Sequence, residues 1–157
     1  MNKQIKTIKA YIEKYGERIK RDRGITKEII SFHEALNPSE FLEYNQKEYE
    51  YCYEALSEQL PVVFKEFLRN QYSRRLFFQF DSNKSRQDKE YGLICIESFS
   101  VLFTSELDYV IIMNTRSTDI SKLESDIAII RRICMSMFPE HNLRKIHLHC
   151  HNLHLYV

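Results

Sequence analysis

Four short groups of residues in the second half of the chain carry side chains that could do chemistry. They are Ser73-Arg74-Arg75, Cys95, Arg116-Ser117-Thr118-Asp119 and His154-Leu155-Tyr156. Guanidinium groups bind phosphate through paired hydrogen bonds, and a thiolate is a strong nucleophile. Arginines, a thiol and a His/Tyr pair together are what a site needs to hold a phosphorylated nucleoside and to attack its base.

The order and spacing of these groups resemble the thymidylate synthase family, which includes the pyrimidine hydroxymethylases. The likeness covers roughly residues 58 to 156 and is strongest over 109 to 118 (YVIIMNTRST) and at the end (HNLHLY). The resemblance implies a homodimer that binds a pyrimidine (deoxy)nucleoside monophosphate. As an enzyme, such a protein would transfer a methyl or hydroxymethyl group to C5 of the base, with methylene-tetrahydrofolate as the donor.

Cys95 lies 21 residues before Arg116, close to the spacing of the family's nucleophile. By resemblance its thiolate would add to C6 of the pyrimidine, and nearby arginines would lower its pKa. Ile94 stands where the family usually has proline, which weakens the expectation of catalysis more than that of binding. The alternative is that a cysteine within LICIESF is simply a buried strand residue.

Arg116 and Ser117 would, by resemblance, bind the nucleotide phosphate, and Asp119 would organise the base and the folate side. The alternative is a polar turn between strand and helix, with Asp119 or Ser121 as the N-cap. Ser73-Arg74-Arg75 resembles the family's S-R-R. There the two arginines reach the phosphate bound by the partner subunit, so a homodimer is part of this prediction. The alternative is a basic helix end favoured by the helix dipole.

Asp126 resembles the residue with which the family reads the base. A carboxylate only accepts hydrogen bonds, so Asp126 favours the exocyclic amine of cytosine. The alternative is an exposed acid in the first turns of a helix. Glu54 is the candidate for handling protons near the base, with Glu50 as a second choice, and a surface glutamate is the alternative for both.

His154 and Tyr156 resemble the family's H-x-Y pair, which binds the sugar hydroxyl. Residues two apart share one face of a strand, so both side chains could point at one ligand. His147, His149 and His151 also alternate and could in principle bind zinc. We expect instead a solvated or interface-lining face, and no metal.

The elements that must position these groups change character near residue 75. Apolar spacing predicts helices in the first half and mostly strands in the second. The expected helices cover 2–21, 26–35, 40–57, 60–70 and 120–138, with a turn at 37–39; the expected strands cover 75–80, 92–103, 108–115 and 143–157, with a loop at 81–90 and a hairpin at 104–106. This order predicts one α+β domain of the thymidylate-synthase type over residues 1–157, with a mixed sheet and N-terminal helices packed on it.

The whole-chain composition excludes several other classes. Lys and Arg number 23 against 22 Asp and Glu, so no bulk attraction to nucleic acid or membrane is expected. Three glycines cannot build a Walker loop or a G-x-G-x-x-G motif. Four scattered cysteines and a charged N-terminal segment predict a cytoplasmic protein. Two non-enzymatic alternatives remain open: a catalytically reduced relative acting as a nucleotide sensor or inactive subunit, and a ligand-free interaction module.

Overall fold

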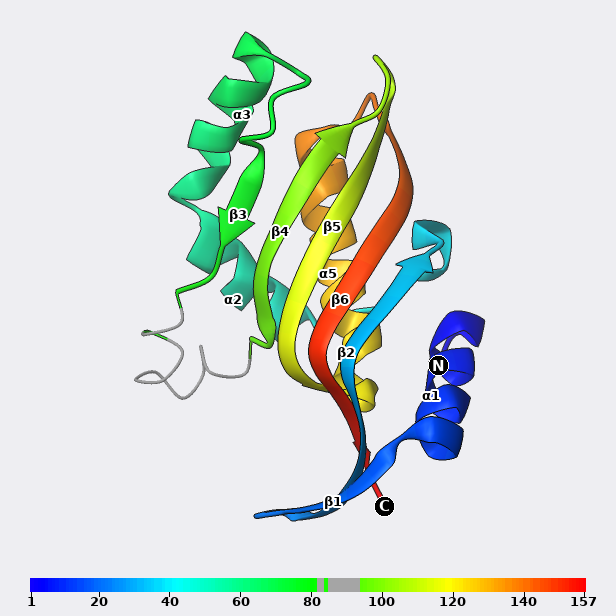
Figure 1. Ribbon diagram of the computed structural model, residues 1–157. Coiled ribbons are helices and arrows are strands. Elements are labelled where there is room, and N and C mark those ends of the chain that lie inside the picture. The colour runs from blue at the N-terminus through cyan, green and yellow to red at the C-terminus, as the bar shows by residue number, and fades with distance from the viewer. Residues whose placement is uncertain (82–83, 85–93) are drawn as a thin grey trace.

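The computed structural model describes residues 1–81, 84 and 94–157. A six-stranded sheet in the order β1-β2-β6-β5-β4-β3 forms its centre (Figure 1). The strands are β1 (Glu17–Arg21), β2 (Gly24–Leu36), β3 (Phe77–Gln79), β4 (Ile96–Phe103), β5 (Asp108–Asp119) and β6 (Asn142–Tyr156). The helices are α1 (Lys3–Tyr15), the short 3-10 helix η1 (Pro38–Glu40), α2 (Gln46–Leu56), α3 (Gln59–Arg69) and α5 (Ile120–Met137).

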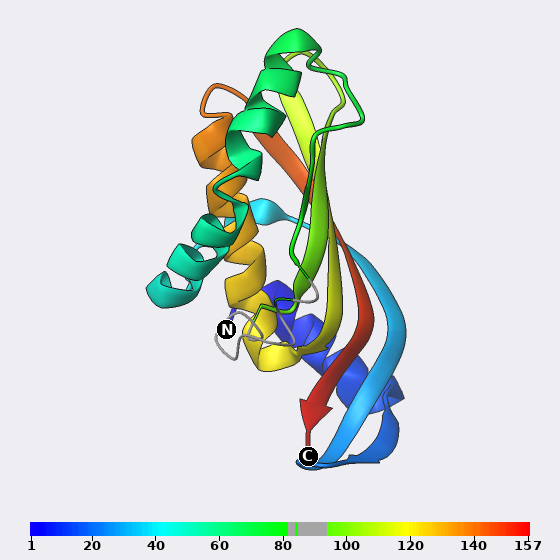
Figure 2. The ribbon, with the colours of Figure 1, turned by 90° about the vertical axis from the view of Figure 1, so that its left-hand side faces the viewer.

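The helices gather on one side of the sheet and leave the other side uncovered by described residues (Figure 2). Helix α5 lies across the middle because its apolar side chains recur every three or four residues, as in Leu123, Ile127 and Ile130, all fully buried. Its first turn is capped by Asp119, and it ends at Met137, just before Pro139. The predicted α5 and the β4–β5 hairpin are therefore confirmed.

Strands β5 and β6 run parallel, and α5 is the crossover between them. Their carboxyl ends lie side by side, with Asp119 opposite His154 in the register. In mostly parallel α/β sheets, ligands bind at the carboxyl ends of the strands. Here β5 and β6 are the one parallel pair among the described strands. The strand ends that carry Arg116–Asp119 and His154–Tyr156 therefore meet at one end of the sheet.

A line of irregularity crosses the sheet just before this end. The Cα pairing passes over Ser31 and His151 between β2 and β6, and over Arg116 and His151 between β5 and β6. Ser31 has a φ of 55°, in the left-handed region. Cys150 and Leu153 are both buried, so the in-and-out alternation of β6 changes phase between them. The pairing is interrupted here without a shift of register, and Figure 1 shows that β2, β5 and β6 are bent strands.

The first half of the chain differs from expectation. The first helix ends at Tyr15 instead of residue 21, and Gly16 leads into β1. The predicted helix over 26–35 is wrong, because these residues form β2 between β1 and β6. β-Branched side chains such as Ile29 and Ile30 favour a strand once a partner strand is available. The helix expected over 40–57 begins only at Gln46, where the Asn45 side chain accepts a bond from Glu48 N–H.

The other predicted boundaries are close to the structure. Helix α3 ends at Arg69 as expected, and β3 occupies the centre of the strand predicted over 75–80. Residues 82–83 and 85–93 of the expected loop and of the start of the following strand lie outside the described residues. The α+β class with a mixed sheet is confirmed.

Candidate functional site

A chain of polar side chains links the carboxyl ends of β5 and β6 to β2. The Ser117 hydroxyl lies 3.3 Å from His154 Nδ1, and the Asn152 side-chain oxygen lies at the same distance from that nitrogen. The Asn152 amide donates to Glu28 Oε1 at 2.6 Å. Four side chains from three strands therefore form one hydrogen-bonded row beside the expected sugar site.

Glu28 anchors this row from within the protein. Its side chain is 2% exposed and accepts two bonds from the Arg21 guanidinium, at 2.7 and 2.8 Å. The Thr26 hydroxyl donates a further bond at 2.6 Å. The bond from Arg21 and these other donors hold the pKa of Glu28 at about 2, against the opposing effect of burial. Glu28 is therefore a fixed negative charge at neutral pH.

Sequence reasoning misses Glu28 and Arg21, because it places both residues in helices, and it does not pair Asn152 with either of them. The run of β-branched residues Ile25, Thr26, Ile29 and Ile30 was the available indication of a strand. Glu28 joins the network because the pairing of β2 with β6 brings its carboxylate to the Asn152 amide.

Arg116 and Cys95 are neighbours, as the spacing predicted. The Arg116 backbone N–H donates to the Cys95 carbonyl at 2.9 Å, and the Arg116 guanidinium bonds to the carbonyl of Ile94. Cys95 is partly buried immediately before β4. Burial raises the pKa of its thiol to about 11, Asp126 adds to the rise, and Lys122 and Arg116 oppose it. The thiol is therefore protonated at neutral pH in this state.

Asp126 of α5 acts electrostatically on the Cys95 thiol. It is buried on α5, and its Oδ2 has no hydrogen-bond partner among the described residues. Burial raises the pKa of this carboxyl to about 8; Glu48 raises it further, and Lys122 opposes the rise. Its charge also contributes to the raised pKa values of Cys52 and Cys150, whose main cause is burial. The alternative of an exposed helix acid is therefore wrong.

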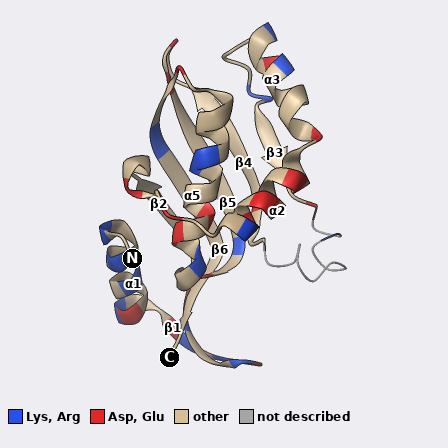
Figure 3. Ribbon diagram, turned by 180° about the vertical axis from the view of Figure 1, so that it is seen from behind, with Lys and Arg blue, Asp and Glu red and all other residues tan. Residues whose placement is uncertain are grey.

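Glutamates of α2 occupy two different environments. Glu54 and Glu50, the predicted proton-handling candidates, are both exposed. Glu48 is half-buried, accepts a bond from the Ser125 hydroxyl at 3.3 Å and acts electrostatically on Asp126. Glu48, and not Glu54, is therefore the α2 carboxylate that belongs to the buried region. Acidic and basic residues are interspersed over α2 and α5 on this side of the molecule (Figure 3).

Asp119 and Tyr156 complete the strand ends. Asp119 caps α5 by accepting a bond from Ser121 N–H at 2.9 Å, as the alternative interpretation of this residue expected. The Tyr156 ring stands nearly perpendicular to that of His154, with 5.8 Å between ring centroids. Tyr156 and Asp119 also line a cavity of about 570 Å³ next to Lys9 and Lys27.

Arg74 and Arg75 lie elsewhere in the same chain. Both are exposed in the connection between α3 and β3, where Arg75 N–H donates to the Ser73 hydroxyl at 3.1 Å. The carbonyl of the adjoining Leu76 accepts a hydrogen bond from the Val101 N–H. Val101 lies six residues after Cys95 in the chain. At about 3.3 Å per step, the backbone beside the pair lies roughly 20 Å from the backbone of Cys95, to which Arg116 is bonded. Within one chain, the structure does not bring these arginines to the site.

Histidines line the uncovered face of the sheet. His33 and His149 stack in parallel with ring centroids 4.1 Å apart, and His151 stacks on His149 at 5.1 Å. Burial, with repulsion from His33 and His151, lowers the pKa of His149. Among the residues that the structure describes, no group of three or more His, Cys, Asp or Glu is placed to hold a metal ion.

No model of a known protein family matches the chain, and no curated protein matches it either. The resemblance to thymidylate synthase therefore rests on the residues quoted above and on their positions. No helix in the described part of the chain is long and apolar enough to cross a membrane.

Proposed function

We propose that this protein binds a pyrimidine (deoxy)nucleoside monophosphate at the carboxyl ends of β5 and β6. The observation that carries the proposal is that predicted groups from separate parts of the sequence lie in neighbouring pairs at this end of the sheet. Arg116 is bonded to the backbone of Cys95, Ser117 lies against His154, and Asp126 acts on the Cys95 thiol. A phosphate, a sugar and a base need such groups at adjacent points of one site.

Each group has a role in this proposal. Arg116 and Ser117 hold the phosphate, since a guanidinium and a hydroxyl are both hydrogen-bond donors to its oxygens. His154 and Tyr156 hold the sugar hydroxyl, and the bond from Asn152 helps to fix the His154 ring. Asp119 takes part through its position at the N-terminus of α5, where it orders the turn that follows Arg116 and Ser117.

In this proposal Asp126 takes the base, which requires its buried carboxyl to become accessible when the nucleotide binds. The protonation state of Asp126 changes the expected selectivity. With its pKa raised to about 8, the carboxyl is mostly neutral at pH 7. A neutral carboxylic acid presents one donor and one acceptor side by side. That pair complements N3 and the exocyclic amine of cytosine, and equally N3–H and O4 of uracil. The preference for cytosine that a charged Asp126 would give is therefore not expected at neutral pH.

In this proposal the protein binds a nucleotide but does not catalyse a reaction on it in the conformation described. The Cys95 thiol, with a pKa of about 11, is not a ready nucleophile, and Glu54 is exposed on α2. These two observations favour the reduced relative, a nucleotide sensor or inactive subunit. The enzymatic candidate remains one-carbon transfer from methylene-tetrahydrofolate, with Cys95 as nucleophile. It requires the bound ligand to lower the pKa of that thiol.

Arg74 and Arg75 would enter the site only from a second copy of the chain. Their distance from Arg116 along β4 leaves a homodimer as the arrangement in which they reach a bound phosphate. This part of the proposal predicts that nucleotide affinity falls when the protein is diluted below its dimerisation constant, whereas a monomeric site would keep its affinity.

A thermal-stability screen with the monophosphates of uridine, deoxyuridine, cytidine and deoxycytidine tests the proposal. A ligand at about 100 times its dissociation constant stabilises the folded state by about 2.7 kcal/mol. We expect this stabilisation to survive Cys95→Ala and to be lost in Arg116→Ala and in Ser117→Ala. Arg144→Ala, at the other end of the sheet, is the matched control. An interaction module would show no stabilisation by any of the four nucleotides.

The enzymatic candidate has its own assay. Release of tritium from C5 of labelled deoxyuridylate or deoxycytidylate reports attack on the base. Release that Cys95→Ala abolishes would establish turnover, and its absence with nucleotide binding intact would establish the sensor or inactive subunit.

A further inference from the structure

The outer edge of β2 is only half covered. Strand β1 pairs with residues 24–28 and no further, so the outer edge of β2 from Ile29 to Leu36 has no partner strand among the described elements (Figure 1). An unpaired strand edge presents backbone donors and acceptors to whatever approaches it. Proteins usually block such edges, and the described residues block this one at one further point, just past the end of β2.

That point is Asn37, and it reveals the direction of the neighbouring backbone groups. The Gln4 side-chain amide donates to the Asn37 carbonyl at 2.9 Å and accepts from the Asn37 N–H at 2.8 Å, as a paired strand would. Groups of alternate residues in a strand point to the same side. The backbone N–H and C=O of Ala35 and His33 therefore also point outward, and no hydrogen bond from a described residue reaches them at this edge.

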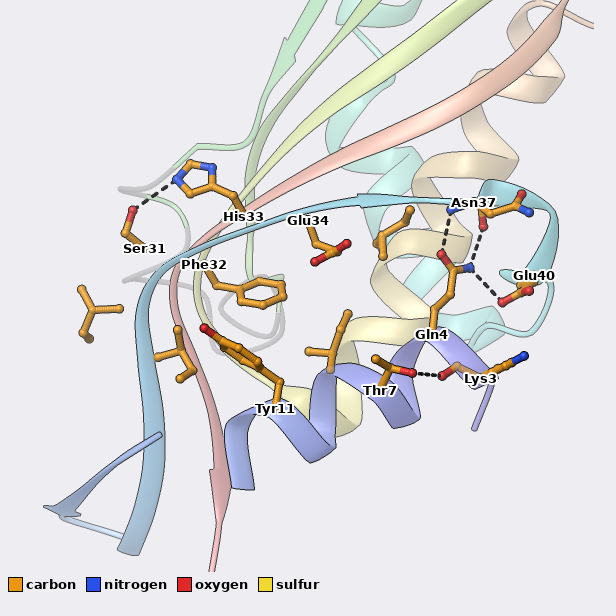
Figure 4. Close-up of a pocket in the computed structure, with 14 residues that line it drawn as sticks. Lys3, Gln4, Thr7, Tyr11, Ser31, Phe32, His33, Glu34, Asn37 and Glu40 are labelled. Atoms are coloured by element: carbon orange, nitrogen blue, oxygen red, sulfur yellow. Dashed lines mark hydrogen bonds between the residues drawn. The ribbon is translucent and has the colours of Figure 1, made fainter. Parts of the chain in front are cut away.

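A hollow of about 710 Å³ lies directly beside this edge, between β2 and α1. Figure 4 shows Phe32 of β2 and Tyr11 of α1 projecting into it toward each other. Their ring centroids are 6.2 Å apart, and Tyr11 is 46% exposed. Ile8 and Leu36 add to the apolar lining. The hollow can therefore take an apolar side chain from a molecule that lies along the edge.

The charged groups of the hollow are mainly acidic. Glu34 is exposed, lies on the same strand face as Phe32, and forms no salt bridge with any described residue. Glu40 bonds to the neutral Gln4, and Lys3 is the one cation of the lining, beyond Gln4 in Figure 4. A cationic side chain near Glu34 would complement this charge.

We propose that the outer edge of β2 at residues 33–35 binds an extended peptide segment of another protein, which adds a strand to the sheet. The segment carries an apolar residue that packs on Phe32 and Tyr11. Two positions away, on the same face, it carries a lysine or arginine that pairs with Glu34. Backbone hydrogen bonds give such complexes their affinity, and the side chains on one face give them their specificity.

The test uses the labelled peptide acetyl-Thr-Val-Thr-Lys-Thr-Val-Thr-amide, which places valine, lysine and valine on one face. Binding is measured by fluorescence anisotropy, and backbone protection by amide hydrogen exchange. We expect saturable binding, with slower exchange at the amides of His33 and Ala35. Replacing the lysine of the peptide by glutamate, or Glu34 by lysine in the protein, should weaken binding about fivefold or more.

Ala35→Pro tests the backbone contact. It removes an N–H that points outward and that β6 does not use, so an edge strand can tolerate it. We expect binding to weaken about fivefold or more, and Ala35→Val, which keeps the N–H, to bind within about twofold of wild type. Circular dichroism checks that both variants fold. A peptide N-methylated at the amides facing β2 should fail against the wild-type protein, which tests the contact even if Ala35→Pro does not fold.

Three results would overturn the proposal. One is an absence of binding at millimolar peptide, and another is binding that leaves exchange at His33 and Ala35 unchanged. The third is protection of these amides that rises with protein concentration in the absence of peptide, which would assign the edge to a second copy of this chain.

Discussion

Replacing Asp126 with asparagine should remove most of the pH dependence of stability that the buried carboxyl creates. Its pKa is about 8 in the folded protein and near the ordinary value of 3.8 in the unfolded chain. Between these values the folded state holds a proton that the unfolded state has released. The stability of the wild-type protein therefore falls as the pH rises, and the fall ends above the folded pKa.

The size of the effect follows from the two pKa values. Linkage predicts that this one group lowers the free energy of unfolding by about 4 kcal/mol between about pH 5 and about pH 8.5. Asparagine does not titrate, so the variant lacks this loss. The amide NH2 of asparagine would take the place of Oδ2, which has no hydrogen-bond partner among the described residues. Its unsatisfied N–H groups lower the stability of the variant by about 1–3 kcal/mol. That penalty does not depend on pH and leaves the difference in slope intact.

Urea unfolding followed by circular dichroism, at intervals across this pH range, measures both proteins. Glu48→Gln provides an independent check, because Glu48 is the next cause after burial of the raised pKa of Asp126. In that variant the fall in stability should end at a lower pH. Equal pH slopes for wild type and Asp126→Asn would refute the reasoning, since they would mean that Asp126 ionises normally in the folded protein.

Two further predictions concern the strand ends. Glu28→Gln should destabilise the protein by about 2 kcal/mol at neutral pH, because the lowered pKa of Glu28 contributes stability above its ordinary pKa of 4.5 that is lost as the pH falls toward about 2. Chemical denaturation at pH 7 and near pH 2 measures it, and a deficit that persists in acid would contradict the charge argument. Asp119→Ala should lower stability by about 1 kcal/mol through loss of the α5 cap, seen as a lower melting temperature, while Ser121→Ala keeps the backbone N–H that the cap uses and should change little.

The second half of the fold was predictable because its local patterns agree with its final environment. Leu123, Ile127 and Ile130 recur with helical spacing and do line one buried face of α5. The apolar runs of β4 and β5 flank a short polar turn, and hairpins form from such local sequence. In these segments the periodicity and the tertiary contacts favour the same structure.

The first half was harder because its strands depend on distant partners. β2 is a strand through its pairing with β6, more than a hundred residues away. Ser31, with its left-handed backbone, also interrupts the pairing with β6, so the core-facing residues Ile29 and Phe32 on either side of it do not follow one two-residue alternation. Without β2 in place, the network of Glu28, Arg21 and Asn152 could not be predicted.

The candidate site was predicted only as far as its motifs are contiguous. The resemblance implied that Arg116 and Cys95 would belong to one site, and their backbones are hydrogen-bonded. The adjacency of Ser117 and His154 comes from the parallel pairing of β5 with β6, which local sequence did not indicate. It did not indicate how deeply Asp126 and Cys95 are buried, because burial depends on how α2 and α5 pack. Nor did it distinguish Glu48 from Glu54, since the orientation of α2 depends on where that helix begins.

Amide chemical-shift mapping with deoxyuridine monophosphate and deoxycytidine monophosphate is the most direct test of the central claim. The account predicts saturable shifts concentrated at Arg116, Ser117, Asn152 and His154, and their loss in Arg116→Ala. Shifts confined to other parts of the chain, or none at millimolar nucleotide, would contradict it.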